Sequence, residues 1–345
     1  MLYVTTRVSQ DAYTANRALS ENRCPEGGFF VPIRMPHFGE GEIAALAGKS
    51  FSQNMADILN LLFGTQLDGW GVEFGIGRYP VKLVSLSGKI TVAESWHNPL
   101  WRFERLASGV EKAIRQSDQI SKTPSDWLMI ASRCAVLFGI VGPLLQNGTL
   151  SKGQLLDIAL PSGDLSALMA AWYARSWGLP IGTIVCCSNE NSSLWNLLHK
   201  GELRTDARSI QTNTPNCDYT VPKDLERLIF AALGRHETER FCQALRMGET
   251  YYLEEEQVKR LRKGIHVCVV SSKRMASTVP NLYKTTGFLA DPYTALAYSG
   301  LIDYRAATGG SRQALLMAEE SPALSLQFVA DCMNITPAEL KLLLD

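Results

Sequence analysis

Short apolar runs alternate with segments of helical spacing in the C-terminal two thirds of the chain. Continuous apolar runs of this length are typical of strands that are buried on both faces. Gly- and Pro-containing turns separate each run from the segment that follows it. A strand, a helix and a strand in this order indicate a parallel sheet covered by helices. The segments are 155–160 (strand), 165–177 (helix), 181–187 (strand), 224–233 and 253–263 (helices) and 265–270 (strand).

The pattern in the N-terminal third is more mixed. It predicts a short strand at the start of the chain, followed by alternating helices and strands up to residue 146. We expect a region 1–120 and a large α/β domain 121–345 that pack together as one unit. The expected elements are a helix at 11–19, a strand at 29–32, a helical stretch at 41–63, strands over 71–94 with a turn at 87–88, and helices at 100–117 and 124–146. A capping box, Thr336 followed by Glu339, predicts a last helix at 336–344.

Charge and cysteine usage narrow the functional classes. The 34 basic residues equal the 34 acidic residues, so the net charge attracts neither nucleic acid nor an anionic membrane. None of the eight cysteines has the spacing C-x-x-C, which argues against a zinc site and for a reducing compartment. The N-terminus lacks the pattern of a signal peptide, and the longest apolar run, near 135–145, contains Gly139, Gly142 and Pro143. We therefore expect a cytoplasmic protein without a membrane span.

The turn 161–166 is one candidate for a ligand site. It joins a predicted buried strand to a helix, and the first N–H groups of such a helix can bind an anion such as phosphate. The turn has one glycine, Gly163, and Asp164 would repel a phosphate. The alternative is that Ser162 or Asp164 caps the helix.

A second candidate lies at residues 94–105. Glu94 and His97 could form a catalytic pair before a predicted helix that contains Glu104. The aromatic residues Trp96, Trp101 and Phe103 favour a structural role instead. No serine or cysteine triad, dinucleotide fingerprint or P-loop occurs in the sequence.

Six segments, in order over nearly the whole chain, resemble motifs of the threonine synthase family. They are 1–7 (M-x-Y-x-S-T-R in the family), 24–32 (A-P-D-G-G-L-Y-V-P), 161–165 with 178–181 (P-S-G-N-F-G, then G-L-P-I), 188–191 (A-T-N-x-N), 214–228 (S-P-S-M-D-I, then N-F-E-R-L) and 287–295 (G-Y-x-x-D-P-H-T-A). The resemblance implies the fold of the fold-type-II pyridoxal-phosphate (PLP) enzymes, which is tryptophan synthase β-like: a three-layer parallel sheet with helices on both faces. The family converts O-phosphohomoserine and water to threonine and phosphate.

The departures from the family pattern fall on the chemistry. The family's H-G-P-T-x-x-F-K-D aligns with residues 97–105, and its Schiff-base lysine becomes Glu104. A carboxylate forms no imine, and Lys112 is about 12 Å further along the helix. No T-S-G-D-T-G segment follows, so the small domain that covers the cofactor is expected to be largely deleted. The phosphate loop becomes Gly163, Asp164, Leu165, Ser166 and Ala167, and the family's T-A-H-P-A-K-F becomes 319–325.

The resemblance and the departures together suggest a truncated, non-catalytic threonine-synthase-like protein without a cofactor. Its positions Asp218, Glu226, Arg227 and Asp291 would hold the scaffold together. The old cleft would take a small anionic ligand, or its exposed floor would contact a second copy or another protein. The alternatives are a PLP-dependent threonine synthase or related lyase of amino-acid biosynthesis, and an enzyme with new chemistry that uses Glu94, His97 and Glu104 as acid and base.

Overall fold

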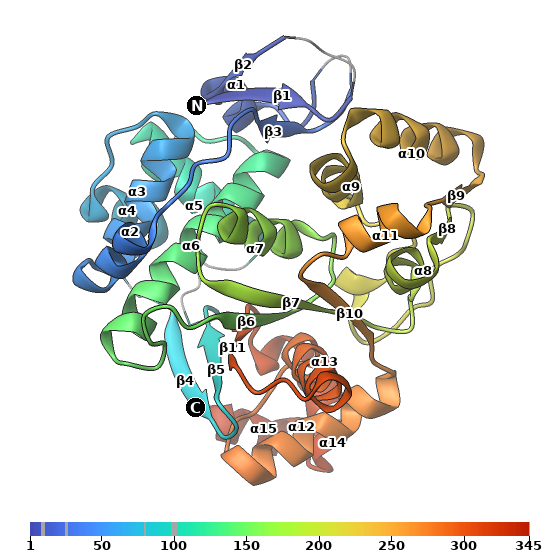
Figure 1. Ribbon diagram of the computed structural model, residues 1–345. Coiled ribbons are helices and arrows are strands. Elements are labelled where there is room, and N and C mark those ends of the chain that lie inside the picture. Colours follow the sequence, from blue (N-terminus) through green and yellow to red (C-terminus); the bar gives the residue numbers. More distant parts are fainter. Residues whose placement is uncertain (8–10, 25–26, 79–80, 98–102, 345) are drawn as a thin grey trace.

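The structure is a computed structural model that describes residues 1–7, 11–24, 27–78, 81–97 and 103–344 (Figure 1). Its strands are β1 (Leu2–Thr5), β2 (Tyr13–Thr14), β3 (Phe30–Pro32), β4 (Lys82–Leu86), β5 (Ile90–Glu94), β6 (Leu156–Pro161), β7 (Ile181–Ser188), β8 (Glu202–Arg204), β9 (Thr250–Tyr252), β10 (Ile265–Val269) and β11 (Gln313–Ala318). Its α-helices are α1 (Ala15–Ser20), α2 (Glu40–Ala45), α3 (Phe51–Phe63), α4 (Gly69–Ile76), α5 (Phe103–Arg115), α6 (Asp126–Gln146), α7 (Ser166–Ser176), α8 (Ser193–Lys200), α9 (Leu225–Leu233), α10 (Arg235–Met247), α11 (Glu255–Leu261), α12 (Ser272–Thr286), α13 (Pro292–Thr308), α14 (Leu326–Met333) and α15 (Pro337–Leu344).

A six-stranded sheet forms the centre of the molecule, in the order β10-β7-β6-β11-β5-β4 (Figure 1). All neighbouring pairs are parallel except β4 and β5, which form an antiparallel hairpin at one side. The carboxyl ends of β5, β6, β7, β10 and β11 therefore meet at one edge. In open parallel sheets, ligands bind outside this edge.

Helices cover both faces of this sheet, so the architecture has three layers. Ile158 and Leu160 of β6 belong to the core that α3, α6 and α7 share. Ala159, which lies between them, belongs to the second core, with α12, α13 and α14. This alternation is the two-residue period of a strand that is buried on both faces.

Two neighbouring residues of α9, Glu226 and Arg227, contact the small sheet β2-β1-β3 and the loop beside it. The Glu226 carboxylate accepts hydrogen bonds from Thr6 Oγ1 (2.5 Å) and from Arg7 Nε and Nη2 (3.0 and 2.8 Å). The Arg227 guanidinium lies 4.5 Å from the ring of Phe29 and pairs with the buried Asp224. Glu226 and Arg227 therefore link segments about 200 residues apart, as expected of scaffold positions.

Asp218 and Asp291 also have structural roles. Asp218 accepts hydrogen bonds from the side chains of Asn189 and Asn191, which follow β7. Asp291 accepts bonds from the backbone N–H groups of Tyr293 and Thr294 and caps α13. Both carboxylates fix the loops at the carboxyl edge of the sheet.

The expectation of strands throughout 71–94 is wrong for its first part, because residues 69–76 form α4. Asp68 caps this helix by accepting a hydrogen bond from Gly71 N at 2.8 Å. Gly75 lies against Gly109 of α5, where a Cβ at residue 75 would meet Gly109 O at 2.0 Å. The glycines that suggest turns here instead allow two helices to approach closely.

The apolar run near 135–145 is part of the 21-residue helix α6, which is long and apolar enough to cross a membrane by length and composition alone. However, 89% of its most apolar window is buried inside the protein. Gly139 lies against Phe51, and Gly142 lies against Asn54 and Leu46. The glycines thus serve close packing of α6 on α3 rather than interruption of the helix.

The chain passes directly from α5 to α6. Residues 116–125 contain no helix or strand, so no domain is inserted where the family has its small domain. The division at residue 120 remains a prediction, and β5, which precedes this residue, pairs with β11, which follows it.

We expect Gly75→Ala to destabilise the protein by about 1–3 kcal/mol, because the added methyl group forces α4 and α5 apart. Gly41→Ala is the matched control, since Gly41 lies in α2 with no atom within 4 Å of an added Cβ. It should be neutral or stabilising, by up to about 1 kcal/mol. The urea midpoints of both variants measure the difference. Equal midpoints would show that the contact between α4 and α5 is not tight.

Candidate functional site

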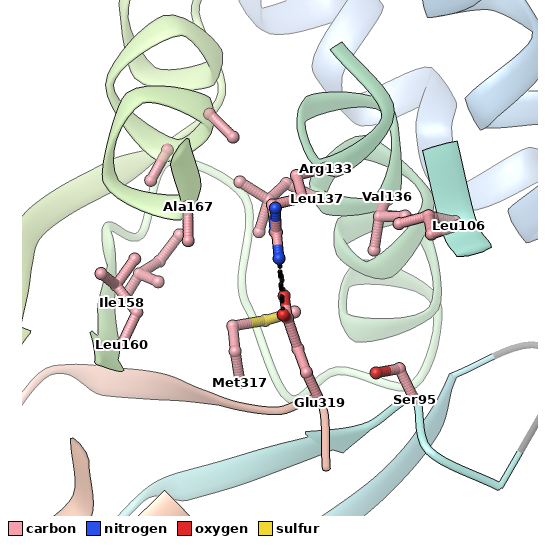
Figure 2. A pocket seen from close by; sticks show the side chains of 12 residues that line it. Ser95, Leu106, Arg133, Val136, Leu137, Ile158, Leu160, Ala167, Met317 and Glu319 are labelled. Atoms are coloured by element: carbon pink, nitrogen blue, oxygen red, sulfur yellow. Dashed lines mark hydrogen bonds and ion pairs between the residues drawn. The ribbon is translucent and has the colours of Figure 1, made fainter. Parts of the chain in front are cut away.

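Two adjoining cavities lie at the carboxyl edge of the sheet, between the ends of β6 and β11 and helices α6 and α7. Figure 2 shows the first, whose walls are mostly apolar side chains. The second extends along the turn between β6 and α7. Their volumes are about 30 and 50 Å³. The residues common to both are Arg133, Leu160, Ala167, Met317 and Glu319.

An ion pair spans the shared part of the cavities. Arg133, from the middle of α6, donates from Nε and Nη2 to the two carboxylate oxygens of Glu319, at 3.2 and 2.8 Å (Figure 2). Arg133 Nη1 donates to Ser166 Oγ at 3.0 Å. Burial alone would lower the pKa of Arg133, but the charge and hydrogen bonds of Glu319 raise it above its ordinary value. The Arg133 guanidinium therefore stays charged although it is buried.

The sequence analysis missed Arg133. One signal for it exists: it is the only charged residue inside the long apolar helix that follows Asp126. A charge in such a helix must be paired when it is buried. Glu319 lies in the segment 319–325, which differs from the family motif. The sequence gives no indication that Arg133 is its partner.

The start of α7 is occupied by a carboxylate of the chain itself. Asp164 Oδ1 accepts hydrogen bonds from Ser166 N (3.0 Å) and Ser166 Oγ (2.6 Å). Asp164 Oδ2 lies 3.4 Å from Lys223 Nζ, which is also 2.7 Å from Asp126. Burial would raise the pKa of Asp164, but the Ser166 bonds and the charges of Lys223 and Arg133 lower it below its ordinary value. Asp164 thus binds the first N–H of α7, although Leu165 and not Asp164 is the N-cap residue of this helix. The anion-binding interpretation of the turn stays a prediction.

The other residues predicted to bind a cofactor phosphate also have partners within the chain. Ser162 N donates to Cys187 O, and Leu165 N donates to Ser162 O. Gly163 N donates to Cys217 Sγ at 3.4 Å. Leu165 has φ of +70°, a left-handed conformation that is unfavourable for a leucine. The turn thus brings all five residues together, and the N–H groups of four of them have acceptors within the chain: Ser162, Gly163, Leu165 and Ser166.

The Glu94 and His97 pair forms, but away from the two cavities. Glu94 Oε2 lies 2.9 Å from His97 Nε2 and 3.1 Å from Lys82 Nζ. Ser95, the next residue, lines the first cavity instead. Strand alternation explains this, because neighbouring side chains leave a strand on opposite faces.

Glu104 lies in the first turn of α5, and its side chain is outside the described part of the structure, as are Trp101 and the side chain of Phe103. Lys112, on the same helix, contacts Asp118 (2.7 Å) and the ring of Phe74 (4.7 Å). It therefore faces α4, and it lines neither of the two cavities.

Comparison with solved structures identifies the fold. PLP-bound threonine synthase from Brucella melitensis has a TM-score of 0.84 with this chain at 19% identity, over 99% of this chain and 94% of the other. Yeast threonine synthase has a TM-score of 0.83 at 17% identity, over 99% and 93%. The fold is that of the fold-type-II PLP enzymes, which confirms the fold prediction.

Sequence comparison points to the same family. Residues 2–69 match the family model described as "Threonine synthase N terminus". Threonine synthase-like 1 of Macaca fascicularis is 30% identical over 158 residues, which are 45% of this chain and 21% of the relative. Threonine synthase of Pseudomonas aeruginosa is 26% identical over 141 residues, or 40% and 30% of the two chains. The chain is similar to threonine synthases over these segments, which span less than a third of the length of the two curated proteins.

We expect Asp164→Asn to lower stability at pH 7 by about 1 kcal/mol, because the amide keeps the cap but loses the attraction of Lys223 and Arg133. The folded-state pKa of Asp164 lies below its unfolded value of about 3.9. The stabilisation is therefore present above this value and disappears as pH falls through the folded-state pKa. Urea unfolding of both proteins from pH 7 to pH 3 measures this. Asp118→Asn, at a highly exposed carboxylate, should change little. A difference that grows toward acid pH would contradict the assignment.

The Arg133 and Glu319 pair can be tested by a double-mutant cycle. Glu319→Gln should destabilise by about 2–3 kcal/mol, because the Arg133 side chain is only 7% exposed and loses its countercharge. Arg133→Met should cost less, since Glu319 can reach solvent. The double variant should be more stable than the sum of the two single effects by about 1–2 kcal/mol. Additive effects on the free energy of unfolding would show that the pair is not coupled.

Proposed function

We propose that this chain is a threonine-synthase-like protein that has lost Schiff-base chemistry and has a binding or regulatory role. The observation that carries the proposal is the Asp164 carboxylate at the start of α7, where it accepts both hydrogen bonds that Ser166 can donate. A phosphate brought to this helix start would meet the negative charge of Asp164 and a Ser166 N–H group that is already bonded.

Two further features of the cleft do not fit PLP. The cavities of about 30 and 50 Å³ are far smaller than the ~300–1,000 Å³ typical of small-molecule sites. No lysine lines either cavity within the described ranges. The sequence alignment places Glu104 where the family has its lysine, and a carboxylate cannot form an imine with the cofactor.

The proposed role follows from what the cleft keeps. Arg133 is a buried, charged group at the carboxyl edge, and its present partner, Glu319, is partly exposed. A small anionic ligand could replace Glu319 on the guanidinium. Alternatively, a second copy or another protein would cover the floor of the cleft, since no domain lies between α5 and α6 to cover it.

We further propose that the protein acts in the cytoplasm.

The second candidate function is a PLP-dependent threonine synthase or related lyase. It is favoured by a fold that matches threonine synthase structures over nearly the whole chain. A third candidate, acid and base chemistry by Glu94, His97 and Glu104, is favoured only by the 2.9 Å contact between Glu94 and His97. If this third candidate is correct, substitution of Glu94 or His97 abolishes an activity that does not need PLP.

Borohydride trapping separates the first two candidates. The purified protein is incubated with PLP, reduced, and analysed by intact mass and peptide mapping. We expect no visible imine band and no modified residue in the cleft, because no described lysine reaches it. An authentic threonine synthase is the positive control. Complementation of a threonine auxotroph tests activity directly. A modified lysine in the cleft or growth of the auxotroph would overturn the proposal.

A further inference from the structure

The first cleft cavity is apolar apart from one ion pair, and this combination points to a class of ligand. Its polar lining residues are Ser95, Arg133 and Glu319, and of these only Arg133 and Glu319 carry a charge (Figure 2). The other lining residues are apolar and come from α5, α6, α7, β6 and β11. A ligand that suits this cavity therefore combines an apolar body with a group that pairs with a guanidinium.

Glu319 binds the guanidinium in the same way as a free carboxylate would. Its two oxygens accept hydrogen bonds from Arg133 Nε and Nη2 at 3.2 and 2.8 Å, which is the bidentate arrangement of an arginine with a carboxylate. Arg133 Nη1 donates separately to Ser166 Oγ at 3.0 Å, so this contact remains when Glu319 leaves. The cleft thus contains a carboxylate-binding site that a residue of the chain itself fills.

The position of Glu319 allows it to leave this site. It is the first residue after β11, and its side chain is 27% exposed, whereas that of Arg133 is 7% exposed. Water can hydrate the Glu319 carboxylate outside the ion pair, but the buried Arg133 guanidinium still requires an anion. The exchange of one carboxylate for another on Arg133 therefore costs little free energy.

The apolar walls of the cavity favour the exchange. A free aliphatic carboxylate has a hydrocarbon chain that the first cavity would bury, and each buried methylene group strengthens binding about fourfold. The cavity of about 30 Å³ has room for about two or three groups of the size of a water molecule. The hydrocarbon chain of a suitable ligand is therefore short.

Anions with two charges suit the cleft less well. The second cavity, which adjoins the first, is lined by two further carboxylates, those of Asp164 and Glu320. Lys223, whose Nζ is 3.4 Å from Asp164 Oδ2, offsets only part of this negative charge. A phosphate would bring two negative charges close to these acids, whereas a carboxylate brings one.

We propose that the cleft binds a short aliphatic carboxylate of about three or four carbons, whose chain fills the first cavity. The ligand carboxylate replaces Glu319 on Arg133, and Glu319 moves toward solvent. This proposal rests on the proposed function, in which the cleft no longer holds PLP. It also gives the regulatory role a physical form, because ligand binding releases a negative charge at the carboxyl edge of the sheet.

A series of straight-chain carboxylates from acetate to octanoate tests the proposal by NMR titration of the purified protein at pH 8. We expect the affinity to rise about fourfold per methylene group up to butyrate and to fall for longer chains, because the cavity is then full. Butyramide, which lacks the charge, and propyl phosphate, which carries a second one, should each bind at least about tenfold more weakly than butyrate. If no carboxylate binds, or if butyramide or propyl phosphate binds as well as butyrate, the proposal is wrong.

Two variants test whether the ligand exchanges with Glu319 in this cavity. Glu319→Gln removes the internal competitor and should tighten butyrate binding about tenfold or more, which a merely structural role of Glu319 would not do. Ala167→Leu fills part of the cavity and should weaken butyrate binding about tenfold or more. Glu239→Gln and Ala306→Leu, at exposed positions of α10 and α13, are the matched controls and should leave the affinity unchanged. Circular dichroism confirms that each variant is folded. Unchanged or weaker binding by Glu319→Gln would overturn the exchange, and unchanged binding by Ala167→Leu would place the ligand outside the cavity.

The borohydride experiment separates this proposal from the proposed function. A PLP-modified lysine in the cleft would overturn the proposed function and the carboxylate site together. If PLP modifies no residue of the cleft and no carboxylate binds, only the carboxylate site is wrong.

Discussion

The central strands β6, β7 and β11 are buried on both faces, and most other features of the protein follow from this constraint. Their apolar side chains need a helical layer on each face, which α6 and α7 provide on one side and α13 on the other. Because the strands are parallel, their carboxyl ends meet at one edge, where each chain segment must turn into a polar loop. Polar groups at this edge are partly cut off from water, so each requires a partner. The identity of these partners determines what the edge can bind.

The sequence pattern predicts the β6-α7-β7 unit because its strands are short apolar runs bounded by Gly and Pro turns. It does not predict β11, although this strand pairs with both β5 and β6. The sequence of β11, Q-A-L-L-M-A, consists of residues with high helix propensity, and only its burial between two strands makes it extended. For residues 69–76 the sequence prediction is wrong in the opposite way, because a helix forms where strands are expected. Their three glycines suggest turns, yet the Asp68 cap and the contact between Gly75 and Gly109 favour a helix.

The sequence predicted some residues of the candidate site but neither Arg133 nor the pairings. The motifs identify Asp164 as a change in the phosphate loop and residues 319–325 as a change near the cofactor ring position. They cannot show that Glu319 pairs with Arg133, since these residues are 186 positions apart and meet only through the order of the sheet. The same holds for Asp164, which is near Lys223 because Asp224 N donates to Asp164 O and fixes the two loops together. The side chain of Glu104, the change that is clearest in the sequence, lies outside the described part of the structure.

The polar groups of the cleft are paired within the chain, and this affects how a ligand could bind there. Asp164 is bonded to Ser166, and Arg133 is paired with Glu319. A ligand must therefore displace an existing partner, and it gains only the difference in free energy. Under the proposed function, the chain closes the position between β6 and β11 with its own charges.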